Sequence, residues 1–177
     1  HTRLRTVTGV QTCALPILSP PHQQNRVLRE GDQFTILIEN SGPGGWYTEL
    51  GRTSVMGKPT QEMQDEFAFV LEARKFTLER LKDGASCKQL WDDYNAFMRA
   101  NKRPEERRVY VHSQGYDMVE RPLVRFDETM PIRKNMVLAV HPTYVTERTY
   151  SWVCDNFLVN GAWPERMHAF PEKITEL

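Results

Sequence analysis

The chain has 177 residues, with 23 lysines and arginines against 23 aspartates and glutamates, so its formal net charge is zero. This length predicts one domain of ordinary size, and the balanced charge argues against a nucleic-acid or anionic-membrane binder, which usually carries a basic excess. Charged residues interrupt every apolar run well before the roughly 20 residues that a membrane span needs. The three cysteines have no CxxC spacing, which argues against a zinc ribbon and favours a reducing, cytoplasmic compartment.

The first 18 residues differ in character from the rest of the chain. The segment VTGVQTCALPI, at 7–17, resembles the translation of a sequencing adapter, and no helical or strand period leads from it into the following residues. We therefore expect residues 1–18 to be a non-native tail that takes no part in the fold. The alternative is a natural, disordered tail. Both interpretations leave residues 19–177 as the domain.

A β-hairpin is predicted near the start of this domain. Residues 34–40 (FTILIEN) alternate between apolar and polar side chains and are followed at 41–45 by SGPGG, a sequence typical of a tight turn. Residues 46–56 are rich in aromatic and β-compatible side chains, so we expect them to return as the second strand.

Two helices are expected after the hairpin. The first should open at 59–60 and stop at 83–84. Its apolar residues recur at steps of three and four: Met63, Phe67, Val70, Leu71, Leu78 and Leu81. The second should begin at Ser86, which forms a capping-box pair with Gln89, and end near Asn101. Its apolar stripe consists of Leu90, Trp91, Tyr94, Phe97 and Met98. We interpret both stripes as core faces.

The last part of the chain is predicted to return to β structure. Strands are expected at 136–146 and 150–159, with a short extended arm at 165–170. The order of elements is a hairpin, two helices and more strands. It predicts an α+β fold in which helices pack on one face of a mainly antiparallel sheet.

Four separated blocks carry a resemblance to a known family. They are Gly31-Asp32 with 34–53, HSQGY at 112–116 followed by ERP at 120–122, MVLAVHP at 136–142, and CDNFLV at 154–159. In this order they resemble the M24 metallopeptidases, which include methionine and Xaa-Pro aminopeptidases and creatinase. The resemblance implies the pita-bread fold, with a curved sheet and helices on one face. The family's catalytic domain is longer, so we expect residues 19–177 to be its C-terminal portion, truncated at the N-terminus.

The resemblance also implies where a metal site would lie. In active peptidases of this family, two metal ions share an Asp, Asp, His, Glu, Glu set, because hard oxygen ligands suit Mn²⁺ or Co²⁺ and carboxylates can bridge two ions. The matching positions here are Leu37, Glu49, His112, His141 and Cys154. Only His112 is identical to the family's residue, and Leu37 cannot bind a metal.

Two neighbouring acids offer alternative ligands. Side chains alternate between faces along a strand, so Glu39 shares a face with Leu37 and would supply a displaced carboxylate. Asp155 points away from the face of Cys154, so it would reach the same site only through a bulge or an offset of one residue.

Two interpretations of the site stay open. In the first, Glu49, His112, His141 and Cys154 hold one divalent ion (zinc, iron or manganese). Their mixed nitrogen, oxygen and sulfur atoms suit a single Zn²⁺ or Fe²⁺ better than a pair of Mn²⁺ ions. In the second, no metal binds and the pocket works by acid–base chemistry, as in creatinase, whose YYT sequence resembles WYT at 46–48.

Further residues receive roles from the resemblance. It implies catalytic roles for His112 and Glu120. It also implies substrate-binding roles for Trp46, Tyr47 and Arg52, with a site-ordering role as the alternative for Arg52.

The expected function is that of a divergent hydrolase acting on a small amide, guanidino or peptide-like substrate. We expect a small-molecule or short-peptide substrate, no nucleic-acid or membrane partner, and a homodimer for the full-length protein. One alternative is an inactive binding module of the same fold. Another is a metal-dependent lyase similar to the DMSP lyases, which use an extra carboxylate that matches Glu39.

Overall fold

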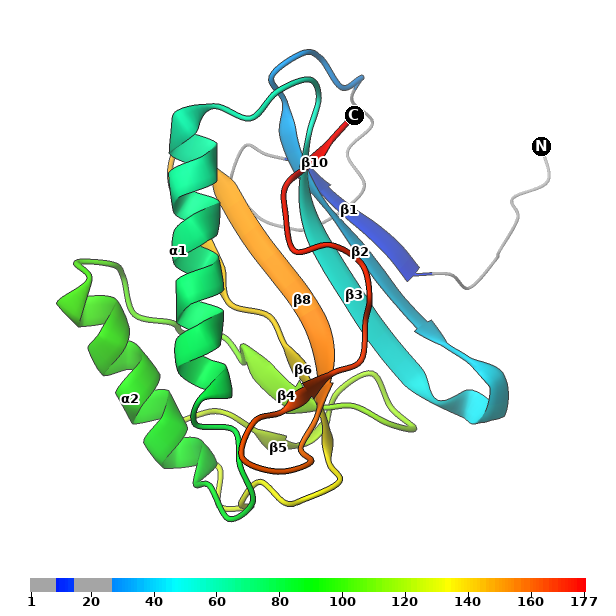
Figure 1. The fold of residues 1–177 in the computed structure, drawn as a ribbon, viewed down its shortest axis with the longest axis vertical. Coiled ribbons are helices and arrows are strands. Elements are labelled where there is room, and N and C mark those ends of the chain that lie inside the picture. The colour runs from blue at the N-terminus through cyan, green and yellow to red at the C-terminus, as the bar shows by residue number, and fades with distance from the viewer. Residues whose placement is uncertain (1–8, 15–26) are drawn as a thin grey trace.

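The computed structural model describes residues 9–14 and 27–177, the first range as backbone only. Within these residues, one sheet has the strand order β1-β2-β3-β8-β6-β4-β5, with β10 paired to β3 and with β7 and β9 paired to β8 (Figure 1). The strands are β1 (Gly9–Ala14), β2 (Gln33–Ser41), β3 (Tyr47–Val55), β4 (Val111–Ser113), β5 (Glu120–Leu123), β6 (Val137–Val140), β7 (Thr143–Val145), β8 (Tyr150–Leu158), β9 (Glu165–Arg166) and β10 (Thr175–Glu176). The helices are α1 (Gln61–Leu78) and α2 (Cys87–Ala100).

The predicted hairpin is confirmed. β2 and β3 pair antiparallel from Gln33 opposite Val55 to Ser41 opposite Tyr47. The chain reverses through a short 3-10 turn at Pro43–Gly45. Gly44 and Gly45 adopt φ values of 80° and 82° there, in the left-handed region that disfavours residues with a Cβ.

Both helices start where the sequence predicts. The Thr60 side chain accepts a hydrogen bond from Met63 N at 3.2 Å, and the Ser86 side chain accepts one from Gln89 N at 3.2 Å. The prediction for the end of α1 is wrong, because the helix stops at Leu78 rather than at 83–84. Tight turns follow and carry Leu81, which is fully buried, away from the helical path and into the core.

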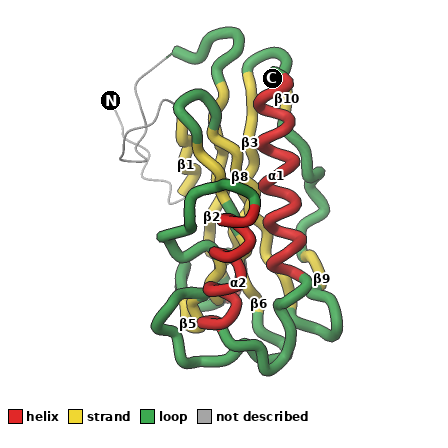
Figure 2. Tube along the Cα trace, turned by 90° about the vertical axis from the view of Figure 1, so that its left-hand side faces the viewer, coloured by secondary structure: helices red, strands yellow, loops and turns green. Residues whose placement is uncertain are grey.

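The two helices lie on one face of the sheet, as predicted, with α1 running along β8 (Figures 1 and 2). The main core forms between them and the strands. Among its most buried members are Leu81, Tyr94, Tyr110, Ile132 and Leu138. This packing leaves the opposite face of the sheet for the polar residues of the site.

The predicted strand at 136–146 is interrupted. It forms β6 and β7, with a break at His141 and Pro142. Proline has no N–H to continue a ladder, and His141 N donates instead to Tyr110 O at 2.9 Å. The short strands β4, β5 and β10 have two to four residues each, too few to show an alternating pattern, so the sequence does not predict them.

β1 lies within the segment expected to be a non-native tail. It pairs antiparallel with β2, with Gly9 opposite Glu39 and Ala14 opposite Phe34. The structure therefore differs from the expectation that this segment has no strand, because the edge of β2 offers free backbone groups that almost any extended segment can pair with. The rest of residues 1–18 lies outside the described residues, and the non-native origin of the tail stays a prediction. Neither described helix is long and apolar enough to span a bilayer.

Candidate metal centre

Three side chains from different parts of the chain converge on the face opposite the helices. Glu49 lies on β3, His112 on β4, and His141 directly after β6. Each offers one ligand atom, and these atoms all lie within 4.8 Å of one another. His112 Nε2 is 3.5 Å from Glu49 Oε2, and the two imidazole centroids are 5.1 Å apart. The family resemblance implies one site for all three, and the structure brings them together.

The strand register explains how they meet. His112 lies opposite Ala139 on β6, and Ala139 lies opposite Asn156 on β8. In the antiparallel ladder between β3 and β8, Gly51 lies opposite Cys154. Two residues further along, Glu49 therefore lies opposite Asn156. There Glu49 N donates to the Asn156 side-chain oxygen at 2.7 Å. One row across the sheet thus carries His112 and Glu49, with Ala139 and Asn156 between them.

The electrostatics couple the three groups. Burial would raise the pKa of Glu49, but the hydrogen bond with His112 and the charges of His141 and His112 lower it overall. Burial works against protonation of His112, yet its hydrogen bond and charge interaction with Glu49 raise its pKa above the ordinary value. Burial lowers the pKa of His141 to about 4. Glu49 is therefore a carboxylate and His141 a neutral imidazole near pH 7, which are the forms that bind metals.

An apolar cluster fills the place of the remaining predicted ligands. Leu37, Ala139, Trp152 and Cys154 pack together and are buried. The Cys154 thiol is fully buried and lies 3.9 Å from Glu49 O, and burial raises its pKa well above the ordinary value. Cys154 is not a member of the three-residue ligand group, although its thiol interacts with the Glu49 side chain, and its role as a fourth ligand stays a prediction.

Glu39 lies beside the centre rather than in it. It is directly across from Glu49 in the β2–β3 register, and burial together with the charge of Glu49 raises its pKa to about 7. Gln114 Nε2 donates to Glu39 Oε1 at 3.1 Å, and Asn156 Nδ2 donates to Gln114 Oε1 at 2.7 Å. A chain of two buried amides therefore links Glu39 to the backbone N–H of Glu49. The structure does not group Glu39 with the three ligand atoms.

Asp155 and Arg52 belong to the other face of the sheet. Asp155 is fully buried and pairs with Arg52 at 2.8 Å, Arg74 at 2.6 Å and Arg166 at 3.2 Å. Arg52 also donates to the carbonyls of Cys154 and Pro171, and so ties the C-terminal segment to the sheet. The predictions of Asp155 as a ligand and Arg52 as a substrate-binding residue are corrected, because strand alternation points both away from the centre.

The remaining predicted residues line a loop next to the centre. Glu120 Oε1 accepts from Asp117 N at 2.8 Å, so Glu120 holds the 114–119 loop and does not reach the ligand group. Tyr47 N donates to Gly115 O at 2.7 Å, and the exposed Trp46 ring makes an edge contact with Tyr116. The structure therefore places Trp46 and Tyr47 at the rim of the site, where their substrate-binding role stays a prediction.

Sequence reasoning missed Gln114, Asn156 and Trp152. Gln114 follows His112 by two residues, and Asn156 and Trp152 flank Cys154 at the same spacing. The period of two that directs neighbouring residues to one face could have found them. The Trp152 ring lies 6.5 Å from the His141 ring, and its indole nitrogen is buried without a hydrogen-bond partner in the described part of the chain.

Comparison with known proteins agrees with this geometry. The family model of metallopeptidase family M24 matches residues 6–162, so the chain belongs to this family. No curated protein matches the chain. Similar solved structures are an X-Pro aminopeptidase from Thermotoga maritima (21% identity, TM-score 0.82, 96% of this chain and 49% of that one) and a prolidase from Pyrococcus horikoshii OT3 (20%, 0.77, 94% and 48%).

A methionine aminopeptidase from Rickettsia prowazekii is also similar (14% identity, TM-score 0.67, 81% of this chain and 66% of that one). These likenesses confirm the pita-bread fold that the sequence blocks imply. The chain spans about half the length of the first two proteins.

The donor set fits one divalent ion. Two imidazole nitrogens with one carboxylate are found in mononuclear zinc and iron sites, which keep a position open for water or substrate. His112 Nδ1 lies 3.0 Å from Ser113 O. A carbonyl only accepts, so Nδ1 is the nitrogen that keeps the proton when His112 is neutral, and Nε2 is the nitrogen that would bind an ion in place of its contact with Glu49. Among residues 27–177 a second ion has no comparable set, because Leu37 and Cys154 are part of the apolar cluster.

Proposed function

We propose that this chain forms part of a metal-dependent hydrolase that cleaves an amide bond in a short peptide or a related small molecule, with one divalent ion. The observation that carries the proposal is the convergence of Glu49, His112 and His141 within 4.8 Å on the face away from the helices. Family membership supports peptidase-like chemistry. The apolar cluster next to the three residues supports one ion rather than two.

Each residue has a part that follows from its position. Glu49, His112 and His141 would hold the ion, which when bound supplies a polarised carbonyl and an activated water. Glu39 lies across from Glu49 and is held by Gln114, so it is placed to accept and return a proton beside the reacting bond. The Trp152 indole is buried and packs with Leu37 and Cys154 beside the three residues, which would give the site an apolar wall.

Metal analysis of the purified chain tests the proposal. We expect about one ion per chain after dialysis against a zinc or manganese buffer, and less than about a tenth of that in the double variant Glu49→Ala/His112→Ala. Glu62→Ala is the matched control, because this carboxylate is exposed in the first turn of α1. A double variant that keeps the full ion content would contradict the proposal.

Activity measurements separate the alternatives. The direct contact between Glu49 and His112 favours metal-free acid–base chemistry as a second candidate. Turnover of a guanidino or amide substrate that persists in a chelator would support it. Elimination products instead of hydrolysis would support the lyase, in which Glu39 is the added carboxylate. A chain that binds no metal and turns over no substrate would support the binding module. The homodimer of the full-length protein is also part of the proposal.

A further inference from the structure

A cavity of about 350 Å³ lies on the helix side of the sheet, opposite the metal centre. Helix α1 and the segment at 163–172 line it together with Phe157 of β8, and we call it the α1–β9 cavity. Three of its lining residues are cations, Arg74, Lys75 and Arg166, whereas Glu172 is the one acid among the described residues that line it. The volume falls within the range of ligand pockets. The cavity thus has the size and the charge for a small anionic molecule.

Arg74 brings a buried guanidinium to this cavity. The residue is 3% exposed, and its Nη1 and Nη2 atoms pair with Asp155 at 2.6 Å and with Glu172 at 2.7 Å. Burial and the charge of Arg52 lower the pKa of Arg74, although both carboxylates act to raise it. The two carboxylates therefore do not compensate fully for the burial of this positive charge.

Arg166 shares the same two carboxylates. Its Nη2 is 3.2 Å from Asp155 Oδ1, and its Nε is 3.0 Å from Glu172 Oε1. This buried Nε nevertheless makes no hydrogen bond within residues 27–177. Asp155 also pairs with Arg52 at 2.8 Å, so three guanidinium groups share two carboxylates. Lys75, exposed on α1, adds a further cation, and positive charge exceeds negative charge by two.

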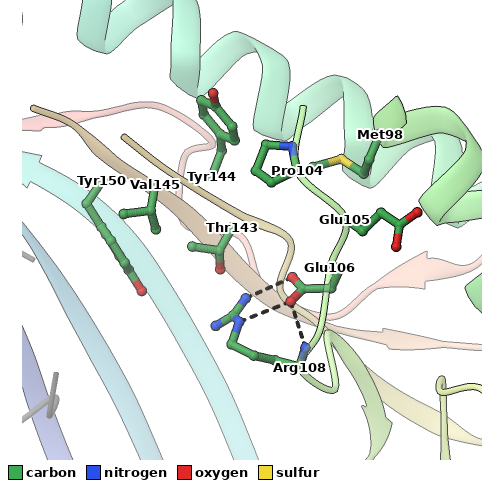
Figure 3. A pocket seen from close by; sticks show the side chains of 9 residues that line it. All are labelled: Met98, Pro104, Glu105, Glu106, Arg108, Thr143, Tyr144, Val145 and Tyr150. Carbon is green, nitrogen blue, oxygen red and sulfur yellow. Dashed lines mark hydrogen bonds and ion pairs between the residues drawn. The ribbon is translucent and has the colours of Figure 1, made fainter. Parts of the chain in front are cut away.

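The cavity between the α2–β4 loop and the β7–β8 hairpin has the opposite balance (Figure 3). There Arg108 Nε and Nη2 donate to the two Glu106 oxygens at 3.2 Å and 3.0 Å, and Glu105 adds a second carboxylate. Acids outnumber bases on that wall, so it has no positive charge to spare. An anion would therefore bind at the α1–β9 cavity rather than there.

Glu172 shows where an anionic group would lie. Its Oε1 is within 3.0 Å of nitrogen atoms of both Arg74 and Arg166, and its side chain is 36% exposed. A molecule from solvent can thus reach the same donors by displacing this carboxylate. A phosphate monoester carries about −1.5 to −2 charge near pH 7, which matches the excess of positive charge better than one carboxylate does. Guanidinium groups donate to phosphate oxygens in pairs.

Trp163 adds a planar apolar surface to the cavity. The residue is 50% exposed, and Leu71 and Leu78 line the same space. An exposed aromatic ring beside a cationic site can stack on a planar part of a ligand. We infer that the α1–β9 cavity binds a small phosphate monoester, with the phosphate at Arg74, Lys75 and Arg166 and a planar group against Trp163. The inference does not depend on the proposed function, because this cavity lies on the other face of the sheet.

Calorimetric titration of the metal-free chain in a chelator tests the inference, because phosphate then has no metal ion to bind. The probes are phenyl phosphate, phenyl sulfate, which carries one charge less, and inorganic phosphate, which has no ring. At constant ionic strength, we expect phenyl phosphate to bind about tenfold more tightly than either of the others. Trp163→Ala should weaken phenyl phosphate alone and leave inorganic phosphate unchanged.

Two exposed side chains allow substitutions that spare the core. Lys75→Gln should weaken phenyl phosphate about fivefold, because it removes one cation. Glu172→Gln should strengthen phenyl phosphate about fivefold, because it removes the competing carboxylate, and a misfolded chain would not bind more tightly. Lys88→Gln is the matched control, because Lys88 is an exposed lysine on α2 that pairs with Asp92, so its affinity should equal that of the wild type.

The inference would be overturned if phenyl phosphate did not bind, if it bound no more tightly than phenyl sulfate, or if Lys75→Gln and Glu172→Gln both left its affinity unchanged. Glu49→Ala/His112→Ala should bind phenyl phosphate as the wild type does, since these residues lie on the opposite face. Loss of phenyl phosphate binding in this double variant would place the ligand at the metal centre and contradict the inference. The metal analysis is decided separately by the ion content.

Discussion

His112 Nε2 lies 3.5 Å from Glu49 Oε2 although two strands, β8 and β6, separate the strands that carry these residues. In a flat sheet, three strand spacings would put the two backbones about 14 Å apart. Side chains of this length cannot close that gap unless the sheet bends toward them. The contact therefore depends on the concave face of the pita-bread fold, and Ala139 between the strands leaves the space for it.

The contact predicts a change in the pKa of His112 in the metal-free chain. Glu49 raises that pKa, so Glu49→Gln should lower it. Titration of the His112 imidazole by NMR measures the change. Glu39 has a smaller effect on His112, so Glu39→Gln is a matched control with a smaller shift in the same direction. If the pKa of His112 were the same in Glu49→Gln as in the wild type, the two side chains would not interact in solution.

The low pKa of His141 should make the stability of the metal-free chain depend on pH. Its pKa falls from the ordinary 6.5 to about 4 on folding. The neutral form therefore contributes stability above about pH 6.5, and this contribution is lost as the pH falls through about 4. The Gln side chain in His141→Gln cannot titrate. Between about pH 7 and 4.5 the free energy of unfolding of this variant should therefore fall less than that of the wild type, and the two falls should differ by on the order of 1–3 kcal/mol.

Urea denaturation of both proteins at these two pH values measures this difference. Parallel losses of stability would mean that His141 is not buried as a neutral group. The comparison between the two proteins cancels the protonation of the carboxylates that they share.

The sequence predicts the hairpin, both helix starts and the three converging side chains of the candidate centre, because each leaves a local pattern. The alternation at 34–40, the caps at Thr60 and Ser86, and the family blocks are all read from neighbouring residues. The sequence does not predict that arginines from β3, α1 and β9 neutralise Asp155. That depends on which face of β8 meets α1. The early end of α1 likewise follows from the burial of Leu81, a tertiary contact that overrides the local helix pattern.

Asp155 predicts a large loss of stability when its charge is removed. Asp155→Asn would leave Arg52 and Arg74 buried with a neutral partner, and breaking such a buried pair costs about 3–5 kcal/mol. Chemical denaturation near pH 7 measures this loss. Asp83→Asn is the matched control, because Asp83 is 62% exposed and lies 4.0 Å from Arg133. It should cost less than about 0.5 kcal/mol. Similar values for the two variants would count against the buried network.

The space around Gly51, beside the metal centre, is too small for a Cβ atom. A Cβ at this position would lie 2.9 Å from the Cys154 Cβ and 3.0 Å from two ring atoms of Trp152. Gly51→Ala should therefore cost about 1–3 kcal/mol, because neither the strand nor the indole can move freely. Gly161→Ala has no atom within 4 Å of its added Cβ and serves as the control. Thermal unfolding of both variants checks the difference, and equal melting temperatures would contradict it.

Substitutions at Leu37 and Cys154 should allow a second ion to bind. They stand at the positions where the family resemblance implies an Asp and a Glu, and both pack in the apolar cluster. Leu37→Asp/Cys154→Glu should destabilise the metal-free chain by several kcal/mol, because it buries two carboxylates without partners. In excess Mn²⁺ the same variant should bind about two ions per chain instead of one, and its melting temperature should rise with metal concentration.

Leu37→Asn/Cys154→Gln has the same shapes without the charge, so it should be destabilised without gaining an ion. Elemental analysis and thermal unfolding with and without Mn²⁺ distinguish the two variants. If the acidic pair still bound one ion, the apolar cluster would not be what restricts the site, and the limit would lie in the replacement of a family Glu by His141. An imidazole offers one nitrogen to one ion, whereas a carboxylate can bridge two.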